Sequence, residues 1–331
     1  MIRPGRRVVV TGACGFIGSH IAERFSAEGF RVMTLDIESG TESGLSPGRP
    51  VQDVERRLVA DVTSPEAAGE VVRFRPDLVI HAAAQTRAGR SITDPVADAH
   101  TNILGTLRML EAARSASAPP FIFISSAAIY GDPVALPLTE DAPHRPLTPY
   151  GVSKLAATHY VSHYRRAGLL PAVSLIPANV YGPGQQAGED GAVVPAFMRE
   201  ALRGEPMTIE GDGSQTRDFV YVEDLVEAVQ LAWRWLGEGG GQAPEAPAVF
   251  NIGTGKQTSI SHLAELVEKT VGRPLGRRYR PPRSGDISRS SLSPRLAGRL
   301  LGWSPRVSLE EGLKRTYEWW AVSTPGCAQR A

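Results

Sequence analysis

Short apolar runs alternate with longer stretches of helical periodicity through the first half of the chain. Five runs are rich in β-branched, aliphatic and aromatic residues, as is typical of strands buried on both faces of a parallel sheet: residues 7–11, 31–35, 78–80, 121–124 and 172–176. A further strand is predicted around Leu58, and one long helix from about Asp94 to Ala116. This alternation predicts an α/β protein with a Rossmann-like, doubly wound parallel sheet.

The pattern changes after residue 176. Proline and glycine become frequent and the strands shorten, while an amphipathic helix is predicted at residues 193–203 and a final helix at residues 308–320. We therefore predict two domains. The first comprises residues 1–176 with a return segment at about 218–252, and the second, a smaller mixed α/β domain, comprises residues 177–331, mainly 177–217 and 253–331.

Composition excludes some classes of partner. The chain of 331 residues carries 36 Lys+Arg against 35 Asp+Glu, without a basic or acidic run, so neither a nucleic acid nor a membrane surface is indicated. Cys14 and Cys327 are the two cysteines, and we expect free thiols in a reducing compartment. No leader segment and no apolar run long enough to cross a bilayer is seen, so the expected location is the cytoplasm.

The first strand leads into a glycine-rich turn, G-A-C-G-F-I-G, at residues 12–18. Its spacing is typical of a dinucleotide-binding turn, because Gly12, Gly15 and Gly18 let the backbone turn tightly and approach a pyrophosphate at the N-terminus of the next helix. The alternative is a tight βα turn without a ligand. The order strand, turn, helix favours the dinucleotide.

The second strand ends at Asp36, where an acidic residue would hydrogen-bond an adenosine ribose. Ile37 and Glu38 follow it rather than an arginine, so a 2′-phosphate would be repelled and NAD is favoured over NADP. The alternative for Asp36 is a helix cap or a turn residue.

Small and hydroxyl-bearing residues follow two later strands. His81 is followed by Ala82, Ala83 and Ala84, whose small side chains allow close approach of a cofactor, and His81 itself is interpreted as a packed structural histidine. Ser125 and Ser126 follow the strand at 121–124, and hydroxyls at the carboxyl end of such a strand lie in the ligand crevice. The alternative is a serine-rich turn.

Tyr150 and Lys154 are four residues apart, which on a helix puts both side chains on one face. A free tyrosine has a pKa of about 10, and a neighbouring lysine cation or an oxidised nicotinamide favours the phenolate. The pair could therefore take a proton from an alcohol. Alone this spacing is weak evidence, since two common residues on an exposed helix match it by chance.

Taken in order, the motifs are more specific than any one of them. The sequence resembles the extended short-chain dehydrogenase/reductase family, and within it the nucleotide-diphosphate-sugar 4-epimerases. The resemblance rests on T-G-A-C-G-F-I-G (11–18), H-A-A-A-Q (81–85), S-S-A-A-I-Y-G (125–131), Y-G-V-S-K (150–154), A-N-V-Y-G-P (178–183), G-D-G-S-Q-T-R-D-F-V-Y-V (211–222), N-I-G-T-G (251–255) and R-S-G-D (283–286).

The resemblance implies a role for each matching position. Tyr150 would accept and donate a proton, Lys154 would bind the nicotinamide ribose and lower the tyrosine pKa, and Ser126 would hydrogen-bond the sugar 4-hydroxyl. The implied NAD contacts are Gly12, Gly15, Phe16, Ile17, Gly18, Asp36, Asp61, Val62, Ala82, Ala83, Ala84, Asn102, Tyr150, Lys154 and Pro177. The implied contacts to the UDP-sugar are Arg87, Ser125, Ser126, Asn179, Val193, Arg217, Arg283, Asp286 and Ser290.

The first predicted domain would thus bind NAD and the second the nucleotide sugar. The resemblance implies no metal, and it implies a homodimer formed through the helix at 94–116 and the helix bearing Tyr150. The default reaction is the interconversion of UDP-glucose and UDP-galactose through a transient 4-keto sugar with resident NAD.

Several departures leave the substrate open. Ala127 and Ala128 stand where the related dehydratases and decarboxylases carry an acidic residue, which argues against elimination but not against an NDP-4-keto-sugar reductase. Arg87 is unusual, and it either faces solvent or recognises the carboxylate of UDP-glucuronate. Ser290 is small enough to admit UDP-N-acetylglucosamine. From a different class, a dinucleotide-sensing regulator of the same fold would predict a broken catalytic set, whereas Ser126, Tyr150 and Lys154 are intact.

Overall fold

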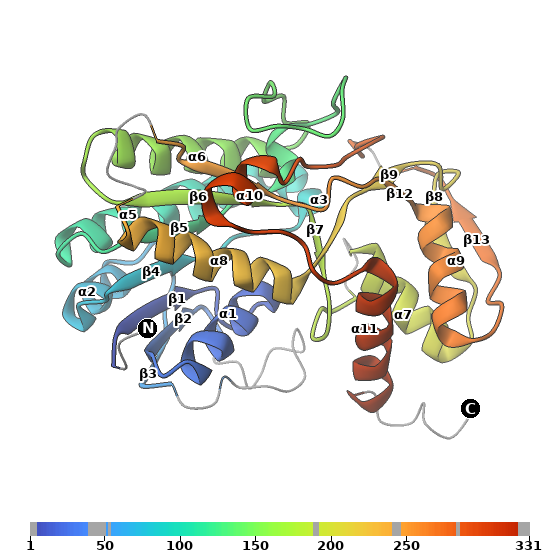
Figure 1. The fold of residues 1–331 in the computed structure, drawn as a ribbon, viewed down its shortest axis with the longest axis horizontal. Helices are drawn as coiled ribbons and strands as arrows, with labels where there is room; N and C mark the ends of the chain where they lie inside the picture. Colours follow the sequence, from blue (N-terminus) through green and yellow to red (C-terminus); the bar gives the residue numbers. More distant parts are fainter. Residues whose placement is uncertain are drawn as a thin grey trace.

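A parallel sheet forms the centre of the protein (Figure 1). The computed structural model describes residues 5–38, 51, 54–187, 192–239, 246–282 and 285–323. Within these residues, seven strands pair in parallel in the order β11-β6-β5-β4-β1-β2-β3. Their bounds are β1 (Arg7–Thr11), β2 (Arg31–Asp36), β3 (Arg56–Val59), β4 (Leu78–His81), β5 (Phe121–Ile124), β6 (Ala172–Pro177) and β11 (Val249–Ile252). The strand order reverses between β1 and β4, which confirms the predicted doubly wound sheet.

Helices bury both faces of this sheet. Val8 and Val10 of β1 pack in a core with α1 (Phe16–Ala27) and α8 (Val222–Gly237), whereas Val9 between them faces α2 (Pro65–Phe74), α5 (Gly105–Ser115) and α6 (Pro149–Arg166). Adjacent residues of a strand point to opposite faces. A run such as V-V-V is therefore apolar throughout, because neither face meets water.

The long helix predicted at 94–116 consists of three segments. A short helix α4 (Pro95–Ala99) begins at Asp94, whose side chain accepts a hydrogen bond from Ala97 N, and a π-helical turn η1 (His100–Leu104) connects it to α5. The apolar periodicity continues through all three, so the sequence does not mark the widened turn. π-helical turns occur frequently at functional sites, and this one carries Asn102.

The remaining elements form a second, smaller group, seen beside the sheet in Figure 1. Its helices are α7 (Val193–Arg203), which the sequence predicts at the same residues, α9 (Ile260–Val271) and α11 (Leu309–Ser323). They share a core around Phe197, Leu263 and Leu313. Three two-stranded pairs accompany them: β7 (Asn179–Tyr181) with β10 (Phe219–Tyr221), β8 (Met207–Glu210) with β13 (Arg277–Arg280), and β9 (Thr216–Arg217) with β12 (Thr258–Ser259). Short helices α3 (Ala88–Thr93), η2 (Ala127–Ile129) and α10 (Arg295–Leu301) complete the chain.

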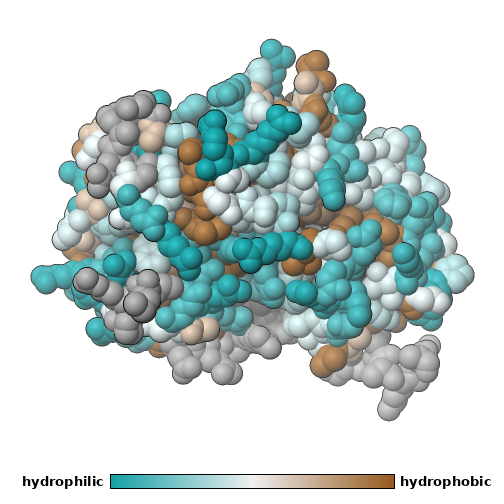
Figure 2. Space-filling model, viewed as in Figure 1, coloured by the Kyte–Doolittle hydropathy of each residue, from teal (hydrophilic) through white to brown (hydrophobic). Residues whose placement is uncertain are grey.

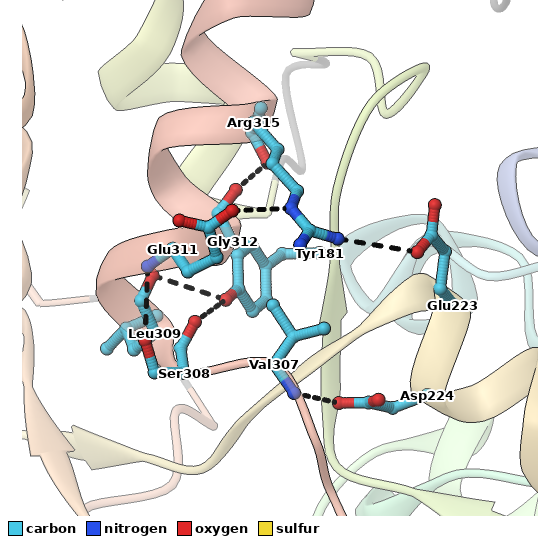
Figure 3. Close-up of polar contacts among 10 residues, drawn as sticks. Tyr181, Glu223, Asp224, Val307, Ser308, Leu309, Glu311, Gly312 and Arg315 are labelled. Atoms are coloured by element: carbon cyan, nitrogen blue, oxygen red, sulfur yellow. Dashed lines mark hydrogen bonds and ion pairs between the residues drawn. The ribbon is translucent and has the colours of Figure 1, made fainter.

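Helix α11 is joined to the rest of the molecule by polar contacts that Figure 3 displays. The hydroxyl of Tyr181, at the end of β7, donates to Leu309 O at 3.3 Å, and a Cβ at Gly312 would overlap that hydroxyl. Arg315 pairs with Glu311 at 2.7 Å and reaches Glu223 on α8 at 3.6 Å. Helix α11 is thereby fixed against both β7 and α8.

Hydrophilic side chains cover most of the face seen in Figure 2, and apolar side chains occur there in small groups. Among the described residues, no helix has the length and hydropathy to cross a membrane. The same residues contain no cluster of three or more His, Cys, Asp or Glu side chains placed to hold a metal ion.

Candidate active site

The glycine-rich turn lies where β1 meets α1. Gly12 has a φ of +69°, and a Cβ there would come within 2.6 Å of Ala83 N, so this close approach of two backbones requires glycine. Gly15 caps α1 without a side-chain hydrogen bond, and the first turn of α1 carries no acidic residue. The N–H groups of that turn therefore point out of the helix end, an arrangement that suits the pyrophosphate of a dinucleotide.

Asp36 lies beside this turn, at the carboxyl end of β2. Its Oδ2 accepts a hydrogen bond from Cys14 N at 2.8 Å, and burial raises the pKa of the carboxyl group. Cys14 is a free thiol whose pKa burial raises to about 11, which makes it unreactive at neutral pH. Cys327 lies outside the described residues.

The other residues predicted to hold a dinucleotide follow the neighbouring strands. Val62 is buried after β3, and the Asp61 carboxylate accepts bonds from the main chain and hydroxyl of Thr63, both at 2.8 Å. Ala82, Ala83 and Ala84 follow β4, Pro177 ends β6, and Phe16 and Ile17 begin α1. These strands are parallel, so their carboxyl ends lie on the same side of the sheet and the structure brings these residues together.

Asn102 lies inside the molecule on the π-helical turn. Its Oδ1 accepts from Gln85 N at 2.8 Å, and its Nδ2 reaches Ser153 Oγ of α6 at 3.0 Å. The amide therefore connects the end of β4 with the helix that bears the candidate catalytic pair.

Lys154 is only 3% exposed. It lies on the second turn of α6, a helix capped by Thr148, whose hydroxyl accepts from Gly151 N at 3.2 Å. The Lys154 Nζ donates to Ile124 O of β5 at 2.6 Å and lies 4.4 Å from the centre of the Phe123 ring. Burial lowers the pKa of Lys154 to about 7, against the opposing field of Asp98.

Tyr150 lies on the first turn of the same helix. Burial raises the pKa of its phenol, while a hydrogen bond with Ser126 lowers it. The Tyr150 main-chain N–H donates to Ser91 Oγ of α3 at 3.1 Å, which fixes the start of the helix. The structure thus brings Ser126, Tyr150 and Lys154 together at the carboxyl end of β5.

The two serines after β5 have different surroundings. Ser125 is buried, and its hydroxyl pairs with Thr158 Oγ1 of α6 at 2.7 Å. Ser126 is partly exposed and begins η2, where its Oγ accepts from Ala128 N at 3.2 Å. Ser126 is therefore the serine beside Tyr150, and a contact of Ser125 with substrate stays a prediction.

His81 has the structural surroundings that the sequence predicts. It is fully buried, with Nδ1 2.7 Å from Thr11 Oγ1 and Nε2 3.1 Å from Thr106 Oγ1. Burial lowers its pKa to about 3, so the ring is neutral at physiological pH.

A cavity of about 900 Å³ lies among the residues predicted to contact substrate. Five of the residues predicted to contact substrate line it: Arg87, Asn179, Val193, Arg217 and Asp286. Arg217 and Asp286 form an ion pair with 2.5 Å between Nη2 and Oδ1. Ser290 is buried and donates its main-chain N–H to Thr216 O, beside Arg217, at 3.1 Å, while Arg283 lies outside the described residues.

This cavity is lined by neither Tyr150 nor Ser126. The structure connects the two regions through adjacent strands, because Ser125 N donates to Leu175 O of β6 at 2.8 Å and Asn179 N donates to Asp218 O at 2.9 Å. Ser126 and the cavity residue Asn179 therefore follow the carboxyl ends of the neighbouring strands β5 and β6.

Sequence reasoning missed several residues of this site. Further arginines line the cavity, namely Arg199, Arg203, Arg278 and Arg280. The first two are four apart on α7, a spacing that places them on one face of the helix and could have identified them. Asp218 was also missed. Its carboxylate accepts from the main-chain N–H groups of Thr254, Gly255 and Leu292, each at 3.0 Å, and so fixes the segment that carries Arg217.

Comparison with known proteins identifies the family. The model of the NAD dependent epimerase/dehydratase family matches residues 8–253. The chain belongs to this family. A UDP-glucose 4-epimerase of Mycolicibacterium smegmatis is 40% identical over 314 residues, covering 94% of this chain and 97% of the relative.

Two solved structures of family members agree with this fold. The UDP-glucose 4-epimerase of Thermotoga maritima with UDP-glucose has a TM-score of 0.86 and 35% identity, covering 96% of this chain and 99% of its own. The UDP-glucose 4-epimerase of Thermus thermophilus in complex with NAD has a TM-score of 0.84 and 37% identity, covering 96% of this chain and 100% of its own. This chain is accordingly an enzyme of the family with NAD as its cofactor, and the uncapped glycine turn with Asp36 beside it fits that cofactor.

Proposed function

We propose that this enzyme is a UDP-hexose 4-epimerase that interconverts UDP-glucose and UDP-galactose with NAD that stays bound between turnovers. The proposal rests on one observation above all: Tyr150 shares a hydrogen bond with Ser126 and lies one helical turn from the buried Lys154. The family and the relatives described above support the same reaction.

The residues that would hold NAD are those gathered at the strand ends. The turn at residues 12–18 would bind the pyrophosphate, Asp36 the adenosine ribose, and Lys154 with Tyr150 the nicotinamide ribose. NAD held by these residues would supply reversible hydride transfer at carbon four of the sugar.

Proton transfer would be the task of Tyr150. The Tyr150 phenolate takes the proton of the 4-hydroxyl as the carbonyl forms, and the resulting phenol returns it when the epimer forms, with Ser126 holding the same oxygen. Burial opposes the phenolate, so nearby positive charge has to stabilise it. Lys154 supplies such a charge when it is protonated, and its Nζ is already held in place by Ile124 O.

The diphosphate would be anchored in the cavity while the 4-keto sugar rotates to present its opposite face. Arg217 is suited to this because its guanidinium is held by Asp286 and its segment by Asp218, which leaves little freedom to the binding group. An anchor of this kind keeps the intermediate in place without fixing the sugar ring.

The carboxylate-bearing substrate UDP-glucuronate is the second candidate. The observation that favours it is Arg87, which lines the cavity and whose main-chain N–H is fixed by Gln85 Oε1 at 2.6 Å. A guanidinium there could pair with a sugar carboxylate. UDP-N-acetylglucosamine and a net 4-keto-sugar reductase remain the further alternatives.

The test is proton NMR on purified protein mixed separately with UDP-glucose, UDP-glucuronate and UDP-N-acetylglucosamine, without added cofactor. We expect the 4-epimer of UDP-glucose to appear. A 4-epimer from another of the three would assign that sugar instead. If all three stay unchanged and an NDP-4-keto sugar with reduced cofactor reacts, the enzyme is a reductase.

We also propose a cytoplasmic homodimer formed through the helical segment at 94–116 (α4, η1 and α5) and through α6 of two copies. Large apolar side chains are exposed on these helices, with Val96 77% and Val152 52% exposed. Gel filtration at micromolar concentration should give the mass of a dimer, and a monomer would contradict the proposal.

A further inference from the structure

A buried carboxylate lies behind the candidate catalytic pair without a role in the reaction proposed above. Asp98 of α4 is 1% exposed. Its Oδ1 accepts from Gln85 Nε2 at 2.9 Å and from Asn102 Nδ2 at 3.1 Å. Its Oδ2 is buried and has no hydrogen-bond partner among the described residues. A buried carboxylate that is only half satisfied is costly, so its presence calls for a compensating charge nearby.

Lys154 is the buried cation on the helix that packs against α4. The two helices pack together, and the field of Asp98 acts on both Lys154 and Tyr150. Burial lowers the pKa of His81 to about 3, so this neighbour of Lys154 adds no charge at neutral pH. The other charged and titratable groups of α3, α4, η1 and α6 are exposed or distant. The exposed ones are Arg87, Arg90, Asp94, His100, His159, Tyr160, His163 and Arg166, and Tyr164 and Arg165 lie about three turns further along α6.

Asp98 is also connected to the main chain of the catalytic helix. The same Asn102 Nδ2 that reaches Asp98 also reaches Ser153 Oγ at 3.0 Å, and the Ser153 hydroxyl donates to Tyr150 O at 3.0 Å. A chain of hydrogen bonds through two side chains thus links the carboxylate to the first turn of α6. A change at Asp98 would therefore alter both the charge near Lys154 and the position of the first turn of α6.

We propose that Asp98 is a positioning residue for the acid–base pair: through Asn102 and Ser153 it holds the first turn of α6, and its buried negative charge balances the Lys154 cation on the helix packed against it. This inference rests on the proposed role of Tyr150 and Lys154 in epimerisation. It assigns to Asp98 an electrostatic function that a merely structural carboxylate would not have.

The sign of the effect follows from the charge. A carboxylate favours the protonated form of both neighbours, so it raises the pKa of Lys154 and that of Tyr150. Removing the charge lowers both values. Turnover needs Tyr150 as a base, which sets the acid limb of the pH profile of kcat, and Lys154 as a cation, which sets the alkaline limb. Both limbs should therefore move to lower pH when the charge is removed.

The decisive variant is Asp98→Asn, which keeps the shape and removes the charge. We expect both limbs of the kcat profile to move down by roughly one pH unit. Asp94→Asn is the matched control, because it removes the same charge from an exposed position and Asn caps a helix as well as Asp does. Its profile should coincide with that of the unmodified enzyme. Unmoved limbs in Asp98→Asn would overturn the proposal.

Asp98→Glu guards against a simple loss of folding. Glutamate keeps the charge but crowds a buried site. If the charge is what matters, both limbs of the pH profile of kcat should stay near their original pH even if kcat itself falls. If the profile of Asp98→Glu moved as far as that of Asp98→Asn, the charge would not be responsible.

A second readout needs no substrate. The phenolate absorbance of the NAD-loaded protein, taken as a difference from Tyr150→Phe, gives the titration midpoint of Tyr150 directly. Asp98→Asn should lower this midpoint, and an unchanged midpoint would overturn the proposal. If the midpoint moves but no nucleotide sugar is epimerised, the proposed function fails while the role of Asp98 stands.

Discussion

Tyr150 lies in surroundings that work against its use as a base. Burial raises the pKa of its phenol and only the hydrogen bond with Ser126 opposes this among its side-chain contacts. For Lys154 the effect of burial has the opposite sign. Burial lowers its pKa to about 7, so neighbouring charges affect how much of it is protonated near neutral pH. The protonation of Lys154 near neutral pH thus depends on small changes in nearby charge, whereas the Tyr150 phenol needs positive charge close by before it can act as a base.

The substitution Tyr150→Phe tests the central residue. It removes the hydroxyl and leaves the ring, so epimerisation should fall by about 10²- to 10⁴-fold, the usual range for a lost general acid–base. Bound NAD should be retained, as measured by the absorbance of nucleotide released on denaturation. Unchanged turnover would instead favour a dinucleotide-sensing protein.

At the scale of elements, the π-helical turn between α4 and α5 determines where Asn102 points. The widened turn ends at Gly105, where a Cβ would come within 2.7 Å of Val62 Cγ2. The helix can therefore approach the loop after β3 only with glycine at this position. The predicted NAD contacts Asn102 and Val62 depend on this one close packing.

Gly105→Ala should accordingly destabilise the enzyme, although alanine is the better helix former by about 1 kcal/mol. The overlap with a stiff valine costs about 1–3 kcal/mol, so we expect a lower thermal midpoint and weaker retention of NAD. Gly69→Ala on α2 is the matched control. Its Cβ would meet only the Arg73 side chain at 3.4 Å, and its thermal midpoint should rise or stay level.

At the scale of the whole molecule, α11 packs against β7 within the smaller group and is connected to α8 of the larger group. Tyr181 packs against Gly312 and bonds to the carbonyl of Leu309, while Asp224 Oδ2 of α8 accepts from Val307 N at 3.1 Å (Figure 3). These contacts fix α11 against β7 and the segment before it against α8.

Gly312→Ala tests this contact. The new methyl group would overlap the Tyr181 ring, and we expect a loss of stability of about 1–3 kcal/mol, measured by denaturant unfolding. Gly237→Ala, in the last turn of α8 where no atom lies within 4 Å, should leave stability nearly unchanged. Adding Tyr181→Phe removes the most crowded atom, so the double variant should recover part of the loss. Equal effects of the two single substitutions would contradict this account.

Much of the fold followed from local pattern. The strands at 7–11 and 121–124 and the helix at 193–203 match the structure residue for residue, because each is an uninterrupted apolar run or an amphipathic period that its surroundings do not override. The glycine turn was predictable for the same reason, since its spacing, its strand and its helix adjoin in sequence.

The sequence by itself determined the sheet, the glycine turn and the pairing of Tyr150 with Lys154 on one helical face. Only the tertiary structure decided that Asn102 lies on a π-helical turn, that Ser126 rather than Ser125 is beside Tyr150, and that the helices of buried Asp98 and buried Lys154 pack together. The physical reason is that these properties arise between elements distant in the chain. Periodicity records which face of a helix is buried, whereas burial of a charge beside another charge depends on how the helices pack.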